Sequence, residues 1–117
     1  MSDVKVDTVR SSSSGTIGRA VSQARGSRLV LDSSSHPNLD AFTNSEAFLG
    51  AISSCGVTLI ETYARDKGIP MTRMEVTIEG SRTAEEPNRF ASIAMSFAIS
   101  GVSREQAEHL VETYRSR

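Results

Sequence analysis

Three segments near the N-terminus alternate loosely between apolar and polar side chains, a pattern that predicts β-strands. They cover residues 4–10, 16–25 and 28–32. Small polar residues separate them, which predicts tight turns at residues 11–15 and at Gly26-Ser27. Because tight turns join only antiparallel neighbours, we expect an antiparallel meander. Residues 33–42 are polar and rich in serine, and they predict an exposed loop.

An uncharged run of apolar and small residues follows, at residues 47–60, between the start and stop signals of a helix. Residues 43–46 match the capping box, in which the first and fourth side chains each accept from a free backbone N–H. Gly68 is a typical helix stop, so we expect a helix over about 44–67. A helix that is apolar or small on every face is expected to be buried on all sides. Cys55, at its centre, is therefore expected inside the fold.

Two strands and a second helix are expected after the long helix. Residues 73–80 and 89–99 alternate between apolar and polar side chains, and residues 81–88 form the turn between them. Residues 103–106 match a second capping box, and the apolar positions after it repeat at helical spacing. The order of strands, long helix, two strands and helix indicates an α+β fold. We expect residues 1–117 to form a single domain.

The overall charge argues against two classes of partner. Thirteen basic and fourteen acidic residues nearly cancel, so no strong field is available for nucleic acid or for an anionic membrane. The uncharged run is also shorter than the roughly 20 residues that span a bilayer. We therefore expect neither nucleic acid nor a membrane as a partner.

The use of cysteine indicates a reducing compartment. The chain has one cysteine, which excludes an internal disulfide. Residues 1–5 lack the basic start and apolar stretch of a signal peptide. A cytoplasmic location is the simplest expectation.

Neither a metal nor a cofactor is expected. His36 and His109 are far apart in the sequence and have no ligand types at metal-binding spacing around them. We expect both histidines to be incidental to function.

Cys55 is the natural candidate for a nucleophile. A thiolate attacks and a thiol does not, so a reactive site must lower the thiol pKa from about 8.5. A helix dipole gives little help in mid-helix, so a neighbouring cation is required. Arg19, Arg25 and Arg28 lie on or beside the predicted strands, and Glu46 could hold such an arginine through a bidentate ion pair. The alternative is structural: Cys55 as a small buried residue, Glu46 as a helix cap, and the arginines on a solvated strand face.

Glu46 and Cys55 are nine positions apart on the predicted helix. At 100° and 1.5 Å per residue they lie on opposite faces, about 13 Å apart along the axis. Either the chain unwinds near Glu46, or Glu46 of one subunit approaches Cys55 of another. We favour a site at a subunit interface.

Residues 43–55 resemble the "TPxELLLAALAGC" helix of the OsmC/Ohr family, the osmotically induced and organic hydroperoxide resistance proteins. The resemblance covers roughly residues 25–117 and is weak before them. It continues through residues 63–70, the strand 74–80, residues 88–90 with the strand that follows, and the final helix.

The resemblance implies an OsmC-like fold in which antiparallel sheets wrap a long buried central helix within an intertwined homodimer. It also implies thiol-dependent reduction of organic hydroperoxides at the dimer interface. Because the sequence has a single thiol, we expect an external thiol to recycle it. Cys55 matches the family's peroxidatic cysteine. Glu46 matches the glutamate that orients the activating arginine, for which Arg19 is our choice and Arg25 the reserve.

Three features depart from the family pattern. Position 45 is serine, and the acid Glu46 lies nine rather than ten residues before Cys55. The sequence stops just before the position of the family's Cys-Pro segment, which carries the resolving thiol. The strand arginine of the family has no clean match.

The sequence therefore leads to two alternative hypotheses about function. The first is a thiol peroxidase acting on hydrophobic peroxides, which requires a guanidinium beside the sulfur. The alternative is a non-enzymatic OsmC-like dimer that binds a hydrophobic ligand, in which the thiol is inert and surrounded by aliphatic groups.

Overall fold

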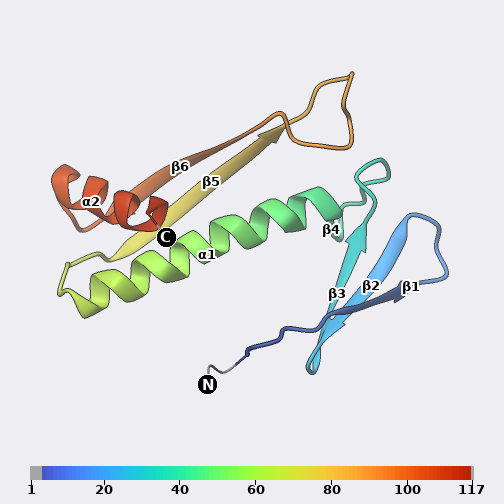
Figure 1. Ribbon diagram of the computed structural model, residues 1–117, viewed down its shortest axis with the longest axis horizontal. Helices are drawn as coiled ribbons and strands as arrows, with labels where there is room; N and C mark the ends of the chain where they lie inside the picture. Colours follow the sequence, from blue (N-terminus) through green and yellow to red (C-terminus); the bar gives the residue numbers. More distant parts are fainter. Residues whose placement is uncertain (1–3, 117) are drawn as a thin grey trace. The chain divides into compact units, whose positions relative to one another are not determined.

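The computed structural model describes residues 4–116. The chain divides into two compact units, Met1–Phe48 and Leu49–Arg117. The first contains a four-stranded sheet and the start of a long helix (Figure 1). The second contains the rest of that helix, a two-stranded sheet and a second helix. This combination confirms the expected α+β class.

The first sheet has the strand order β1-β2-β3-β4. The strands are β1 (Arg10–Ser13), β2 (Arg19–Ala24), β3 (Ser27–Asp32) and β4 (Phe42–Thr43). The first three strands form the expected antiparallel meander. The short β4 pairs parallel to β3 and was not expected, because two residues carry no visible alternation.

Several boundaries in this sheet differ from the sequence prediction, among them the start of β2, which lies at Arg19 rather than at residue 16. The strand predicted at 4–10 begins only at Arg10, and β1 occupies most of the predicted turn. Serine is a common turn residue, but here Ser11 forms a cross-strand hydrogen bond of 2.8 Å with Ser22, a kind of pair that stabilises strands. The next turn is Arg25-Gly26 rather than Gly26-Ser27, and Arg25 takes the positive φ of 58° that a glycine usually supplies.

The helix α1 (Asn44–Asp66) agrees with the predicted bounds. At its start, Thr43 N donates to Glu46 Oε1 at 2.9 Å and Glu46 N donates to Thr43 Oγ1 at 3.2 Å, which is the predicted capping box. After its end, Gly68 adopts a left-handed φ of 68°, as a terminating glycine does.

Burial along α1 differs from the prediction. Its buried residues are Gly56, Ile60 and Ala64, which form one stripe at a spacing of four. The expectation of burial on every face is therefore wrong for the single chain. Cys55 lies outside the stripe and is exposed.

By length and composition alone, α1 could cross a membrane. The core helix of a soluble protein meets the same criterion. Because one stripe of α1 forms part of the second unit's core, we retain the prediction that it does not span a bilayer.

The second unit is built around that stripe. β5 (Arg73–Ser81) and β6 (Ser92–Ser100) form an antiparallel pair, and α2 (Arg104–Arg115) begins at a capping box of Ser103 and Gln106. β5, β6 and α2 lie alongside α1 in Figure 1. Ile60 and Ala64 form the buried core with Leu110 of α2. Partly buried side chains complete it: Tyr63, Ile69, Met71, Met74, Phe97, Ile99 and Tyr114.

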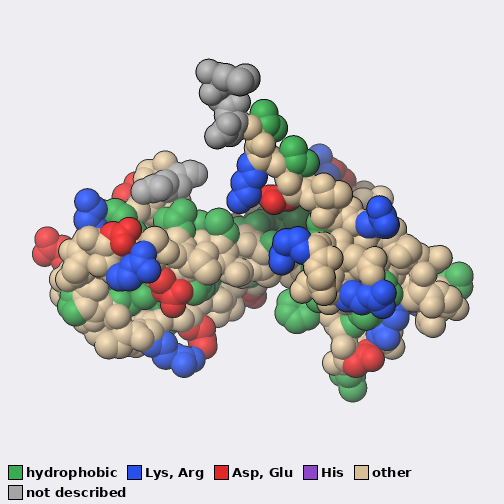
Figure 2. All heavy atoms as spheres, turned by 90° about the horizontal axis from the view of Figure 1, so that it is seen from below, with side chains coloured by type: hydrophobic (Ala, Val, Ile, Leu, Met, Phe, Trp, Pro, Cys, Tyr) green, Lys and Arg blue, Asp and Glu red, His purple; other side chains and the backbone are tan. Residues whose placement is uncertain are grey.

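The described part of the first unit, residues 4–48, has no comparable core. Among its described residues, 4–48, the buried ones are Asp32 and Thr43, and both are polar. Hydrophobic side chains instead lie at the surface, as the space-filling view shows (Figure 2). The large exposed ones in this unit are Val4, Val6, Val9, Ile17, Leu29, Val30, Leu39, Phe42 and Phe48.

Candidate functional site

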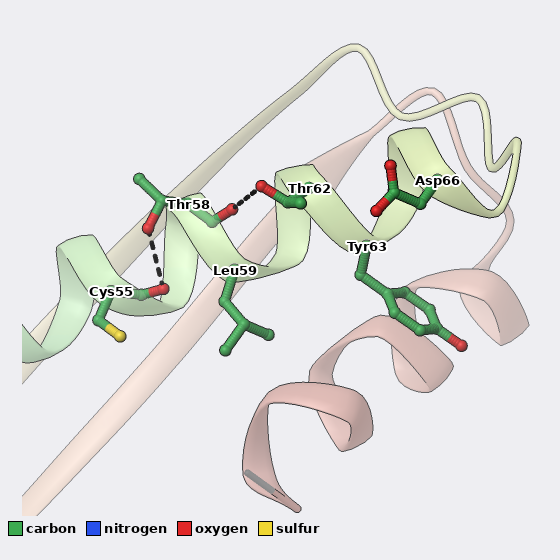
Figure 3. Close-up of a pocket in the computed structure, with 6 residues that line it drawn as sticks. All are labelled: Cys55, Thr58, Leu59, Thr62, Tyr63 and Asp66. Carbon is green, nitrogen blue, oxygen red and sulfur yellow. Dashed lines mark hydrogen bonds between the residues drawn. The ribbon is translucent and has the colours of Figure 1, made fainter. Parts of the chain in front are cut away.

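Cys55 lies in an open hollow of about 380 Å³ along α1. The residues that line it all belong to this helix: Cys55, Thr58, Leu59, Thr62, Tyr63 and Asp66. In Figure 3, Leu59 and Tyr63 point toward α2, while Thr58 donates to the carbonyl of Cys55 at 3.3 Å. The hydroxyls of Thr58 and Thr62 thus both donate hydrogen bonds to backbone carbonyls of α1. The hollow leaves the sulfur accessible beside an aliphatic side chain.

Among the described residues that line this hollow, only Asp66 carries a charge, and it is negative. A thiolate needs a neighbouring cation because the middle of a helix offers little dipole stabilisation. The lining of the hollow within one chain therefore lacks the group that would activate Cys55.

Glu46 has the predicted capping partner and not the arginine that the sequence also suggested. Its carboxylate accepts the backbone N–H of Thr43 in the capping box, and within residues 4–116 it forms no ion pair with an arginine. The helix is continuous from Asn44, so the alternative in which the chain unwinds near Glu46 is wrong.

Arg19 lies at the centre of an ion-pair cluster in the first unit. Its Nε and Nη2 donate to the two carboxylate oxygens of Asp32 at 2.7 and 3.0 Å, a bidentate pair. On its other side, Nη2 and Nη1 donate to Asp40 at 2.7 and 3.4 Å. Asp32 also accepts from Asn38 Nδ2 at 3.2 Å. Two carboxylates thus hold one guanidinium.

The two carboxylates differ in their surroundings. The side chain of Asp32 is 0% exposed and that of Asp40 is 73% exposed, while Arg19 is 23% exposed. The Arg19 hydrogen bonds lower the pKa of Asp32 from 3.8 to about 2, against the effect of burial. They also lower the pKa of Asp40. The same bonds, chiefly that to Asp32, raise the pKa of Arg19, so the cluster stays fully charged.

Sequence reasoning did not identify Asp32 and Asp40. A hairpin turn at Arg25-Gly26 places Arg19 directly opposite Asp32 in the register of β2 and β3. Cross-strand partners point to the same face, so a correct turn position would have revealed this pair. No local pattern identifies Asp40, which reaches Arg19 from a loop.

The remaining candidates lie elsewhere. Arg25 occupies the β2–β3 turn and Arg28 is exposed on β3. His36 contacts Ser35, and His109 accepts from or donates to the Tyr63 hydroxyl at 3.0 Å. Within residues 4–116 no group of three His, Cys, Asp or Glu side chains is arranged to hold a metal ion.

The family model described as OsmC-like protein matches residues 36–117. This range includes α1 with Cys55, the whole second unit and the end of the first sheet. No curated protein matches the chain.

Solved structures share the fold over nearly the whole chain. An OsmC-like protein from Mycoplasma pneumoniae is 16% identical, with a TM-score of 0.81, covering 97% of this chain and 82% of that one. An organic hydroperoxide resistance protein OsmC from Legionella pneumophila is 19% identical, with a TM-score of 0.70, covering 98% and 85%. An OsmC-like protein of unknown function from Vibrio cholerae is 13% identical, with a TM-score of 0.75, covering 97% and 89%. The expected OsmC-like α+β fold of the single chain is thereby confirmed.

Proposed function

Because the chain belongs to the OsmC-like protein family, we propose that it is a thiol-dependent peroxidase that reduces organic hydroperoxides. Family membership and the name of the Legionella neighbour support a stress-related redox role. One observation carries the finer proposal: the single thiol, Cys55, is exposed in an open hollow beside an aliphatic side chain. A free thiol of this kind is suited to a reducing compartment such as the cytoplasm.

The proposed chemistry begins with attack of the Cys55 thiolate on the distal oxygen of the hydroperoxide. An S–O bond forms and the O–O bond breaks, so that sulfur is oxidised to a sulfenic acid and the peroxide leaves as an alcohol after taking a proton. The sequence has no second cysteine. An external thiol would therefore condense with the sulfenic acid and release water, and a second external thiol would reduce the mixed disulfide.

The proposal includes a homodimer. At 100° per residue, the exposed positions Ala51, Cys55, Thr58 and Thr62 lie together on α1, opposite its buried stripe. These four side chains are uncharged. Within residues 4–48, moreover, most of the large hydrophobic side chains are exposed and none is fully buried. A second copy that covers both surfaces would supply the missing burial.

Within that dimer, Arg19 is the proposed activating cation. Its support is that a buried carboxylate already holds its guanidinium and that a dimer interface can bring residues of two copies together. Glu46 would lie at the same interface, with helix capping as its role in each chain.

The alternative is a dimer that binds a hydrophobic ligand without catalysis. One observation favours it: no cation lines the Cys55 hollow among the residues described. In that case the thiol would be unreactive toward peroxides.

Peroxide consumption separates the two functions. The purified protein, with dithiothreitol as reductant, should consume cumene hydroperoxide faster than hydrogen peroxide, because the hollow offers Leu59 to an organic group. Cys55→Ser should abolish the activity, since serine cannot form a sulfenic acid. Ser54→Ala is the matched control: it removes an adjacent exposed hydroxyl and should retain the activity. Rates equal to those of free cysteine, unchanged in Cys55→Ser, would rule out the peroxidase.

A further inference from the structure

We infer that Asp32 is a positioning residue for Arg19, and that Asp40 covers the side of the same guanidinium that would otherwise face an anion. This inference rests on the proposed function, because it assigns Arg19 the role of stabilising the Cys55 thiolate. It assigns opposite effects to two aspartates that contact one arginine.

Asp32 has the properties of an anchor. It is fully buried, and it accepts two parallel hydrogen bonds from Nε and Nη2 of Arg19. Bidentate pairs of this geometry fix the plane of a guanidinium. Asn38 donates to the same carboxylate and thereby limits its rotation. Arg19 therefore leaves β2 with its guanidinium held at a defined place at the end of the sheet.

Asp40 has the properties of a removable cover. It is 73% exposed, and it reaches Nη1 and Nη2 from a loop rather than from a strand. Asp32 accepts no hydrogen bond from Nη1 and accepts one from Nη2. Both nitrogens therefore have an N–H group available for a second anion. A thiolate beside Arg19 would use the same N–H groups as Asp40, so the two anions would compete.

The charge of the cluster makes the distinction testable. One guanidinium and two carboxylates carry a net charge of −1, and replacing either aspartate by asparagine brings the cluster to zero. If charge alone mattered, both replacements would favour the Cys55 thiolate equally. If Asp32 positions Arg19, its replacement would disfavour the thiolate although a negative charge has been removed.

The experiment measures the rate at which iodoacetamide alkylates Cys55 as a function of pH, together with kcat/KM for cumene hydroperoxide, in the intact protein. We expect Asp40→Asn to lower the pH of half-maximal alkylation and to raise the rate at pH 7 about threefold. We expect Asp32→Asn to raise that pH and to lower the rate at pH 7 at least about threefold. Arg19→Gln should resemble Asp32→Asn.

A further variant tests the role of Asp32 independently, in case Asp32→Asn does not fold. Asn38→Ala removes a donor to Asp32 but leaves every charge in place. It should shift the alkylation profile in the same direction as Asp32→Asn, by a smaller amount. Circular dichroism of each variant identifies any that fail to fold.

Shifts in opposite directions for the two aspartates would support the inference. Shifts in the same direction, or none, in a protein that does reduce cumene hydroperoxide would overturn the inference and leave the peroxidase intact. A wild-type protein without peroxide reduction would instead refute the proposed function, and the inference with it.

Discussion

At the scale of single residues, charge pairing at the end of β2 has a clear physical consequence. Asp32 is buried and ionised because Arg19 compensates its charge at 2.7 Å. A carboxyl group whose pKa is lower in the folded than in the unfolded chain binds its proton preferentially when the chain unfolds. Acid should therefore weaken the fold through this residue.

The free energy of unfolding of the wild-type protein should be constant in this respect above a pH of about 5 and should fall progressively below it, since the ordinary pKa of Asp32 is 3.8 and its folded pKa is about 2. Urea unfolding at a series of pH values measures this. Asp32→Asn should be less stable at neutral pH and should lose less stability between pH 4 and pH 2. Parallel curves for the two proteins would contradict the assignment.

The site was only partly predictable from single residues. Cys55 could be singled out because it is the only thiol and lies in mid-helix. The exposure of Cys55 could not be predicted, because the hydropathy of an apolar helix does not show which of its faces is covered by the same chain. The partners of Arg19 depend on strand register, and an error of one residue at the Arg25-Gly26 turn was enough to hide Asp32.

At the scale of elements, two glycines end segments of the second unit with left-handed backbone. Gly68 follows α1 with a φ of 68° and has open space where a side chain would be. Gly101 lies between β6 and α2 with a φ of 85°, and a Cβ there would meet the carbonyl oxygen of Pro70 at 2.6 Å. The first position is restricted by backbone conformation alone, the second also by contact.

Gly68→Ala should lower the free energy of unfolding by roughly 1 kcal/mol, the usual cost of a left-handed alanine. Gly101→Ala should cost at least about 1 kcal/mol more, because the Pro70 backbone cannot move aside easily. Urea unfolding of the two variants gives the comparison. Equal losses would show that the contact at Gly101 relaxes freely.

Elements with strong local signals were predictable. Both capping boxes were located from four-residue patterns, and α1 and β5 agree with their expected bounds within one residue. Elements that depend on distant partners were not. β1 lies in a serine-rich segment, and its cross-strand hydroxyl pair decides against a turn there. β4 depends on its register with β3.

At the scale of the whole molecule, the proposed dimer makes the exposed face of α1 an interface. Ala51→Glu places a charge on that face, next to other uncharged side chains but at a position exposed in the single chain. Burial of an unpaired charge should weaken dimerisation at least about tenfold. Sedimentation velocity over a range of concentrations measures the dissociation constant.

Ala84→Glu is the matched control, since Ala84 lies in the exposed loop between β5 and β6. It should leave the dissociation constant unchanged. Equal weakening by both variants would assign the effect to overall charge, and a protein that sediments as a monomer throughout would refute the dimer.

The lack of a buried apolar side chain in residues 4–48 has a consequence for biogenesis. A segment that gains its hydrophobic burial only from a neighbour has little reason to fold before that neighbour arrives. If the proposed dimer supplies that burial, this part of a newly made chain would remain open to proteases and chaperones until assembly. Cellular abundance would then rise with the rate of synthesis more steeply than in proportion, because each chain is protected by meeting another.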